Sequence, residues 1–426
     1  MERINLNYIE KKENTITYNF SVSEGLSQFF SGKPFKIEYP ENIEEVPDAI
    51  AAIPFVCNVL PVVWMMNCEL HVKELDEVFW GCIPEVKKGY ETMYSQIAFA
   101  GNINIERIVP CDRPASGEKA VFFSGGLDAV NTLLCHMDEH PTLISIWGAD
   151  IRYENIDGWE VVHKGIKEYA EKYGLTAVVI RSTFRQFDNE SNLHSKFCTE
   201  LNGGWWYCVK HGIGLLGHAA PYAYLHGVSN VYIASSNCSA YGQVKCASDP
   251  LIDNQVRYAN VSVTHDSFEL SRQDKVHNVV DYVTRTGEQL ALHVCWESQL
   301  GGNCCRCEKC YRTMTELIAE GVDPVKYGFF DAPTYIPHMK TYLIKEKLNS
   351  PDLAREWQNI SKRLKSNRKE ASKLLYWNHV KWMIKTDFYH LEKIDVLVKK
   401  RIRNHLAKFK FYQVLHKVKA KYKQHH

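Results

Sequence analysis

The chain has 426 residues, of which 45% are hydrophobic and 24% charged, and its formal net charge is +1. This composition is that of a globular protein rather than a disordered or fibrous one, and the length allows a large core and two or three domains. The first thirteen residues are charged and contain no apolar segment of the kind that secretory signals have. The longest apolar run, residues 51–66, contains two prolines and is too short to span a bilayer. We therefore expect a soluble, cytoplasmic protein.

Residues 1–117 are expected to form a small α+β domain. Alternating apolar residues predict short strands over residues 4–8, 15–20 and 35–39. Helices are expected over residues 44–52 and 84–97, with a buried run between them. No residue pattern in this domain indicates chemistry.

From residue 120 onward, predicted strands and helices alternate. The strands cover residues 120–123, 142–147, 176–181 and 230–235, and the helices between them cover residues 129–137, 159–173 and 205–226. This βαβ order predicts an α/β domain over residues 118–330, in which a parallel sheet has helices on both faces. Ligands bind at the carboxyl ends of the strands in such folds, and the residues expected there are Ser124, Asp150, Arg181 and Ser236.

Residues 331–426 are expected to be helical, and they end in a strongly basic segment. Residues 393–426 contain eleven Lys and Arg and one acid, a charge of +10, so residues 1–392 carry −9. Apolar residues recur there at three- and four-residue steps, which predicts a basic amphipathic helix. Either its apolar stripe packs on the body of the protein, or the helix binds an anionic partner such as RNA, a membrane surface or an acidic protein.

The sequence VFFSGGLDAVN, residues 121–131, predicts a strand, a glycine turn and a helix start. Backbone N–H groups at such a turn can hold a phosphate or pyrophosphate. The residues that would bind it are Ser124, Gly125, Gly126, Leu127, Asp128 and Ala129. Asp128 would orient the loop or a magnesium ion. The segment is not a Walker loop, because no Gly-Lys-Ser/Thr follows, and a tight turn without a ligand is the structural alternative.

Four cysteines near residue 300 have the spacing of a metal site. Cys295, Cys304, Cys307 and Cys310 follow the pattern C-x8-C-x2-C-x2-C, and two glycines lie between the first cysteine and the rest. Four thiolates at this spacing can converge on one tetrahedral zinc ion in a closed, structural site. An iron–sulfur cluster and a set of buried reduced cysteines are the alternatives, and the neighbouring Cys305 makes the choice of ligand ambiguous.

The loop resembles the SGGxDS pyrophosphate loop of the PP-loop ATP pyrophosphatases. Loop and cysteines in this order resemble the 7-cyano-7-deazaguanine synthases of queuosine-precursor biosynthesis, over about residues 119–315. The resemblance implies a PP-loop fold and ATP, Mg²⁺ and zinc as ligands. It also implies adenylation of a carboxylate, displacement of AMP by ammonia to give an amide, and a second adenylation that dehydrates the amide to a nitrile.

Other landmarks of that family are present in altered form. Asn237 stands near the family's Gly-x-Asn turn, and Asp249, Asp253 and Arg257 fall in its acidic substrate segment. Arg272 stands where the family has a lysine, which implies a catalytic contact with phosphate, alongside Asp128; a surface salt bridge is the alternative for Arg272.

The chain departs from the family in three respects. Ala129 replaces the last hydroxyl residue of the loop motif, and about a hundred residues precede the loop and follow the cysteines. The substrate segment is also different and contains Trp206, His211 and His218. Two histidines seven residues apart lie on one helical face and could contact substrate in a cleft, or have structural roles. Trp206 could stack on a base or sugar, or pack in the core.

We predict an ATP-dependent ligase that forms AMP and pyrophosphate while activating a small carboxylate. The acceptor stays open among a deazapurine, a sugar acid and a protein, as does assembly into a homo-oligomer. Sulfur transfer is a second hypothesis, and it requires a reactive thiol among Cys198, Cys208, Cys238 and Cys246. A non-catalytic nucleotide-binding or scaffold module is a third, motivated by Ala129.

Overall fold

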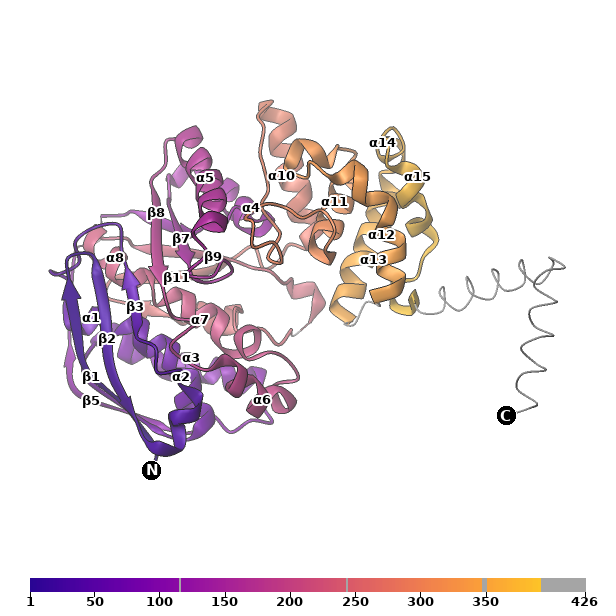
Figure 1. Cartoon of the computed structure of the whole chain (residues 1–426). Helices are drawn as coiled ribbons and strands as arrows, with labels where there is room; N and C mark the ends of the chain where they lie inside the picture. Colours follow the sequence, from indigo (N-terminus) through magenta and orange to yellow (C-terminus); the bar gives the residue numbers. More distant parts are fainter. Residues whose placement is uncertain (115, 243, 347–350, 392–426) are drawn as a thin grey trace, which may run out of the picture. The chain divides into compact units, whose positions relative to one another are not determined.

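The computed structural model describes residues 1–114, 116–242, 244–346 and 351–391 (Figure 1). The predicted basic helix after residue 393 lies outside these residues. By its internal contacts the chain divides into two compact units, Met1–Cys304 and Cys305–His426. No helix in the described ranges has both the length and the apolar character needed to cross a membrane.

The first unit is built on one eleven-stranded mixed sheet in which most neighbouring strands are parallel. The strand order is β10-β11-β9-β6-β7-β8-β3-β2-β1-β4-β5 (Figure 1). The strands are β1 Arg3–Lys12, β2 Thr15–Val22, β3 Phe35–Glu38, β4 Glu69–Asp76, β5 Asn102–Val109, β6 Lys119–Phe122, β7 Thr142–Trp147, β8 Ala177–Ser182, β9 Asn230–Ala234, β10 Arg257–Tyr258 and β11 Val261–Asp266.

The helices of this unit connect and cover the strands. They are α1 Asp48–Ala51, α2 Ile53–Met66, α3 Glu77–Met93, α4 Leu127–Cys135, α5 Ile156–Tyr173, α6 Glu190–Leu201, α7 His211–Leu216, α8 Ala219–His226, α9 Pro250–Asp253 and α10 Arg272–Thr286. A π-helix, Trp206–Lys210, leads directly into α7.

The predicted βαβ region is confirmed as an α/β structure. Strands β8, β7, β6, β9 and β11 are neighbours in that order and all parallel. Successive strands of the chain are therefore added in one direction across the sheet from β6 to β8, and in the opposite direction from β9 to β11. With right-handed crossovers, this reversal places the connecting helices on opposite faces of the sheet.

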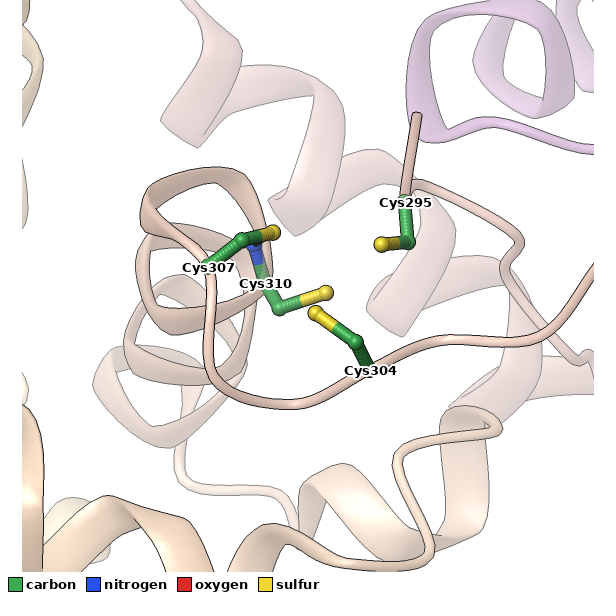
Figure 2. Close-up of side chains that lie close together, drawn as sticks. All are labelled: Cys295, Cys304, Cys307 and Cys310. Atoms are coloured by element: carbon green, nitrogen blue, oxygen red, sulfur yellow. Dashed lines mark hydrogen bonds between the residues drawn. The ribbon is translucent and has the colours of Figure 1, made fainter. Parts of the chain in front are cut away.

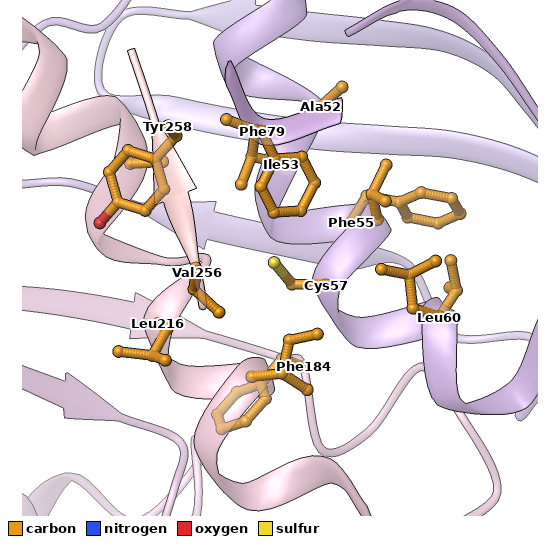
Figure 3. Close-up of a cluster of buried hydrophobic side chains, with 14 of the residues drawn as sticks. Ala52, Ile53, Phe55, Cys57, Leu60, Phe79, Phe184, Leu216, Val256 and Tyr258 are labelled. Atoms are coloured by element: carbon orange, nitrogen blue, oxygen red, sulfur yellow. The ribbon is translucent and has the colours of Figure 1, made fainter. Parts of the chain in front are cut away.

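Side chains on both faces of this parallel half of the sheet are buried. Ala120 and Phe122 face the main core, which also contains residues of α1, α2, α3, α7 and α8. Figure 3 shows part of this core. Val121 and Phe123 face the other way and are also buried. The Phe123 ring centroid lies 5.0 Å from that of Tyr169 on α5, so α5 covers this second face.

The N-terminal strands extend the same sheet. The predicted strands near residues 4, 15 and 35 are confirmed as β1, β2 and β3, and β3 pairs antiparallel with β8 at Ile37 and Ser182. The predicted boundary at residues 117/118 therefore does not interrupt the sheet, and the limits of the functional domains stay a prediction. Strands β4 and β5 were not predicted, because Glu74 and Arg107 stand where the alternation would place an apolar residue.

Two predicted N-terminal helices have different limits in the structure. The helix expected over residues 44–52 is only the four-residue α1, after which α2 starts beside Pro54. The helix expected over residues 84–97 is α3, which starts at Glu77 because Asp76 caps it by accepting from the Phe79 amide at 2.9 Å. Pro84 lies inside α3 rather than at its start.

In the N-terminal half of the sheet, the residues that the structure describes cover only one face. Ile4 on β1 and Leu70 on β4 are fully buried in the main core. On the opposite face, Asn7, Lys73 and Asn104 are exposed. This half therefore presents an open polar sheet face.

The part of the second unit that the structure describes is built from helices. Its helices α11 and α13 pack on each other, and Trp357 on α13 is fully buried and donates its indole N–H to Glu308 at 2.9 Å. Arg363 forms a bidentate pair with Glu320. The helices are α11 Glu308–Glu320, α12 Ala332–Glu346, α13 Pro351–Ser366, α14 Arg368–Ala371 and α15 Trp377–Val380.

Candidate functional site

The predicted phosphate loop connects the end of β6 to the start of α4. Gly125 has φ +72°, and its carbonyl accepts from the His293 amide at 2.7 Å. Gly126 is the N-cap of α4 and has no side chain to accept the first helical N–H groups. The Ser124 hydroxyl accepts from the Gly126 amide at 3.3 Å. The loop thus has the backbone arrangement of an anion site at a helix N-terminus.

Asp128 binds two buried cations from the start of α10. Its carboxylate oxygens lie 2.9 Å from Arg272 Nη1 and 3.5 Å from Lys275 Nζ. Both cationic side chains are at most 4% exposed. Ser271 begins α10 with a capping box that it shares with Asp274. The surface salt bridge considered for Arg272 is excluded by its burial, and the pairing with Asp128 joins the two predicted catalytic residues.

Lys275 is a residue that sequence analysis missed. It donates to the Ser235 carbonyl, at the end of β9, as well as pairing with Asp128. Lys275 follows Arg272 by three residues, and such a pair shares one helix face, so this spacing was the available signal. The lysine connects the loop after β6 with the loop after β9.

A polar network holds α4 against α10 behind the loop. Asn131 on α4 donates to Ser267 at 3.0 Å and accepts from Asn278 on α10 at 3.0 Å. Thr132 donates to Asp266, the last residue of β11, at 2.7 Å. Because each buried amide or hydroxyl here has a partner, the network fixes the relative positions of the two helix starts.

The loops after β6 and β9 lie at the point where strand order reverses. Adjacent parallel strands whose crossovers leave on opposite faces create a crevice at their carboxyl ends, which is where ligands bind in open α/β sheets. Asn237, two residues after Ser235, is half-buried. Its backbone N–H donates to the Ser235 hydroxyl at 3.2 Å. Ser124, Ser235 and Asn237 therefore belong to loops at the carboxyl ends of the parallel strands.

Aromatic rings and arginines gather at the carboxyl ends of β7 and β8. The Arg181 guanidinium lies 4.0 Å from the ring centroids of both Trp147 and Tyr153. Arg185 lies 4.3 Å from the Trp206 centroid, and His211 packs edge-on against Trp206 at 5.1 Å. Trp206 and His211 therefore lie together at the π-helix, a feature that often marks functional sites.

His218 has a different environment from His211. The two histidines are not on one continuous helix, because α7 ends at Leu216 and α8 begins after His218. His218 is fully buried, with ring nitrogens 2.9 Å from Ser182 Oγ and 2.6 Å from the Gly214 carbonyl oxygen. Burial lowers its pKa to about 3, so the ring is neutral. These contacts favour the structural role that the sequence left open.

The acidic segment around residue 250 is largely buried. Asp249 caps the short helix α9 by accepting from the Leu251 amide at 2.9 Å, and burial raises its pKa. Asp253 is fully buried, with a carboxylate oxygen 2.8 Å from His265 Nδ1. Arg257 on β10 is exposed. The contacts of the two aspartates are those of structural residues.

The four predicted cysteines converge. Their sulfur atoms all lie within 4.8 Å of one another, and Figure 2 shows the side chains directed toward a common centre. Tetrahedral zinc–sulfur bonds of about 2.3 Å require sulfur separations of about 3.8 Å, so a small contraction would complete the site. The cluster could hold a metal ion such as zinc. It contains Cys304 and not Cys305, which resolves the ambiguity in the sequence.

Local structure explains this arrangement. Cys307 is the N-cap of α11, and its sulfur accepts from the Cys310 amide at 3.5 Å, which stabilises a thiolate. Cys305 adopts a left-handed φ of +55°. Gly301, with φ +77°, permits close approach to α5, because a Cβ there would lie 2.3 Å from the Gly158 carbonyl oxygen.

Comparison with models of known families, with curated proteins and with solved structures found no match.

Proposed function

We propose that the chain is an ATP-dependent adenylating ligase of the PP-loop class, similar to 7-cyano-7-deazaguanine synthases. The observation that supports this best is the joint position of the Gly125-Gly126 loop and the Asp128–Arg272 pair at the strand-order reversal. An anion-binding helix start with a buried arginine beside it suits the binding of pyrophosphate.

In the proposed reaction, a carboxylate oxygen of the acceptor attacks the α-phosphorus of ATP, and the bond to the β-phosphate breaks. The amides of the loop and Arg272 would stabilise the charge on the leaving pyrophosphate. Asp128 would hold Arg272 and Lys275 in position. Bound Mg²⁺ would further neutralise the phosphates. Ammonia or an amine would then attack the acyl carbon, and AMP would leave.

Sulfur transfer has less support from the thiols. Burial raises the pKa of Cys208, and burial raises that of Cys246 to about 12, so both stay protonated at neutral pH. A reactive thiolate is required for that chemistry. Two of the four candidate cysteines, Cys208 and Cys246, are therefore unsuited to sulfur transfer.

The test is formation of AMP and pyrophosphate with a panel of carboxylates that includes 7-carboxy-7-deazaguanine. Arg272→Ala is expected to reduce turnover by about 10²- to 10³-fold, since it removes a donor to the leaving group. Arg285→Ala is the matched control, because Arg285 lies on the same helix and is exposed. If the wild-type chain neither binds ATP nor forms AMP, the proposed enzymatic function is refuted.

Ala129 distinguishes the ligase from a non-catalytic nucleotide-binding module. Its side chain is buried in the first turn of α4, where the family has a hydroxyl. If the wild-type chain binds ATP without turnover and Ala129→Ser restores AMP formation, the natural loop is a binding module. Turnover by the wild-type chain supports the ligase.

We also propose that the cysteine cluster, Cys295, Cys304, Cys307 and Cys310, holds structural zinc. Cys307→Ser tests this, because serine would still cap α11 while removing a thiolate ligand. We expect elemental analysis to find about one zinc per wild-type chain and much less in the variant. Cys135→Ser, at an exposed cysteine, is the control. Iron together with visible absorbance would instead indicate an iron–sulfur cluster.

A further inference from the structure

The open face of β1, β4 and β5 carries a polar row that crosses three strands. Asn5 on β1 pairs with His71 on β4, and His71 pairs with Asn104 on β5. Side chains paired in this way lie side by side on one face of a sheet. Ser21 on β2 pairs with Asn5 and extends the row to a fourth strand.

This face is hollowed. The cavity has a volume of about 620 Å³, within the range of small-ligand sites. Besides Asn5, His71 and Asn104 of the row, the lining comprises three polar residues from the same strands, Asn7, Lys73 and Glu106, and the apolar residues Leu6, Val72, Trp80, Ile103, Ile105 and Ile108.

Asparagine is an unusual choice for these positions. Asparagine is depleted in strands, and threonine would serve an exposed strand position better. Yet three asparagines line the cavity, Asn5 and Asn7 at alternate positions of β1 and Asn104 on β5, while the neighbouring positions on the other face are apolar. Residues that oppose local propensity without a gain in packing are expected where they serve a function.

The amides are oriented by their neighbours. Asn104 Nδ2 lies 3.3 Å from His71 Nε2, and Asn7 Nδ2 donates to Asn19 at 3.1 Å. Asn5 Nδ2 donates to Ser21 Oγ at 3.4 Å. A carboxamide has two N–H donors and an oxygen with two lone pairs, so these bonds use only part of its capacity. The row can therefore both donate to and accept from a ligand.

We propose that this face binds a neutral glycan chain. Hydroxyl groups of a sugar both donate and accept, and they match carboxamides that do the same. Lys73 and Glu106 have opposite charges, so the site does not select a charged polymer, whereas a nucleic acid would require an excess of cations. Trp80 and Ile108 offer apolar area for the C–H face of a sugar ring. The row carries amides on β1 and β5, an imidazole on β4 and a hydroxyl on β2, and its reach across four strands suits an extended chain.

The test is affinity electrophoresis of the full-length chain in gels that contain dextran, laminarin, galactomannan, xyloglucan or hydroxyethylcellulose. We expect at least one of these polymers to retard the wild-type chain. Asn104→Thr should weaken the interaction about tenfold, since it removes hydrogen bonds to the ligand. Threonine favours strands, so the melting temperature should be unchanged or higher.

Asn102→Thr is the matched control, because Asn102 is exposed on the same strand and does not line the cavity. It should bind as the wild-type chain does. The proposal is overturned if no neutral polymer retards the wild-type chain, if only hyaluronan or alginate does, or if Asn104→Thr binds equally well. A lower melting temperature for Asn104→Thr would assign that residue a structural role and also overturn the proposal.

Discussion

The two halves of the sheet differ in how they are covered. Strands β6, β7 and β9 have buried residues on both faces, so their ligand site is expected at the strand ends. Strands β1, β4 and β5 have one buried face and one open face, and the proposed glycan site lies on the open one. The same sheet thus offers two kinds of surface, because helices cover only part of its second face.

The largest loss of stability on substitution is expected where the two halves of the sheet meet. Asp188 bridges to Phe30 of the N-terminal region, and its carboxylate lies 2.6 Å from Lys210 Nζ, with both charged side chains at most 1% exposed. Asp188→Asn should lower the free energy of unfolding by about 3–5 kcal/mol, because it leaves the buried lysine charge with only the more distant carboxylate of Glu190, at 3.9 Å, as a partner. Chemical denaturation measures this.

The control is the double variant Asp188→Leu with Lys210→Met, which removes both charges and should be closer to the wild type. Equal losses in the single and double variants would contradict the interpretation of a paired buried charge.

Alanine substitutions along the strands test the difference in coverage directly. Leu143→Ala and Ile144→Ala, adjacent on β7 and both fully buried, should each cost about 2–5 kcal/mol. On β4, Leu70→Ala should cost a similar amount, and Lys73→Ala on the open face should change stability by less than about 0.5 kcal/mol. A large cost at Lys73 would mean that this face is covered in solution.

The smallest expected effect is a dependence of stability on pH through His136. The ring nitrogens of His136, at the end of α4, lie 2.7 Å from Glu139 and 2.9 Å from Asp266. Burial lowers the pKa of His136, but hydrogen bonds to these two carboxylates outweigh it and raise the pKa above its ordinary value. The resulting stabilisation is complete below the unfolded pKa of about 6.5 and is lost as pH rises through the folded pKa.

His136→Gln should therefore lower the melting temperature more at pH 5.5 than at pH 9. Thermal unfolding at both values checks this. His140→Gln, five residues after α4 ends at Cys135, is the control. An equal effect of His136→Gln at the two values would rule out a charged His136.

Several features could be predicted because they depend on local pattern. The βαβ order, the glycine loop and the cysteine spacing each involve residues close in the chain, and the structure contains the alternating strands and the converged sulfurs. The pairing of Asp128 with Lys275 joins residues 147 positions apart, and the burial of His218 depends on packing between helices. Such long-range contacts have no periodic signal in the sequence.

By itself, the sequence determined an α/β region whose first strand leads through a glycine turn into a helix, together with four cysteines that could hold one metal ion. Backbone preference and short-range spacing suffice for both. Only the tertiary structure decided that β3 pairs with β8, that Arg272 is buried against Asp128, and that the N-terminal strands leave a polar face open. Strand pairing and burial are set by the free energy of packing the whole chain, which no single segment contains.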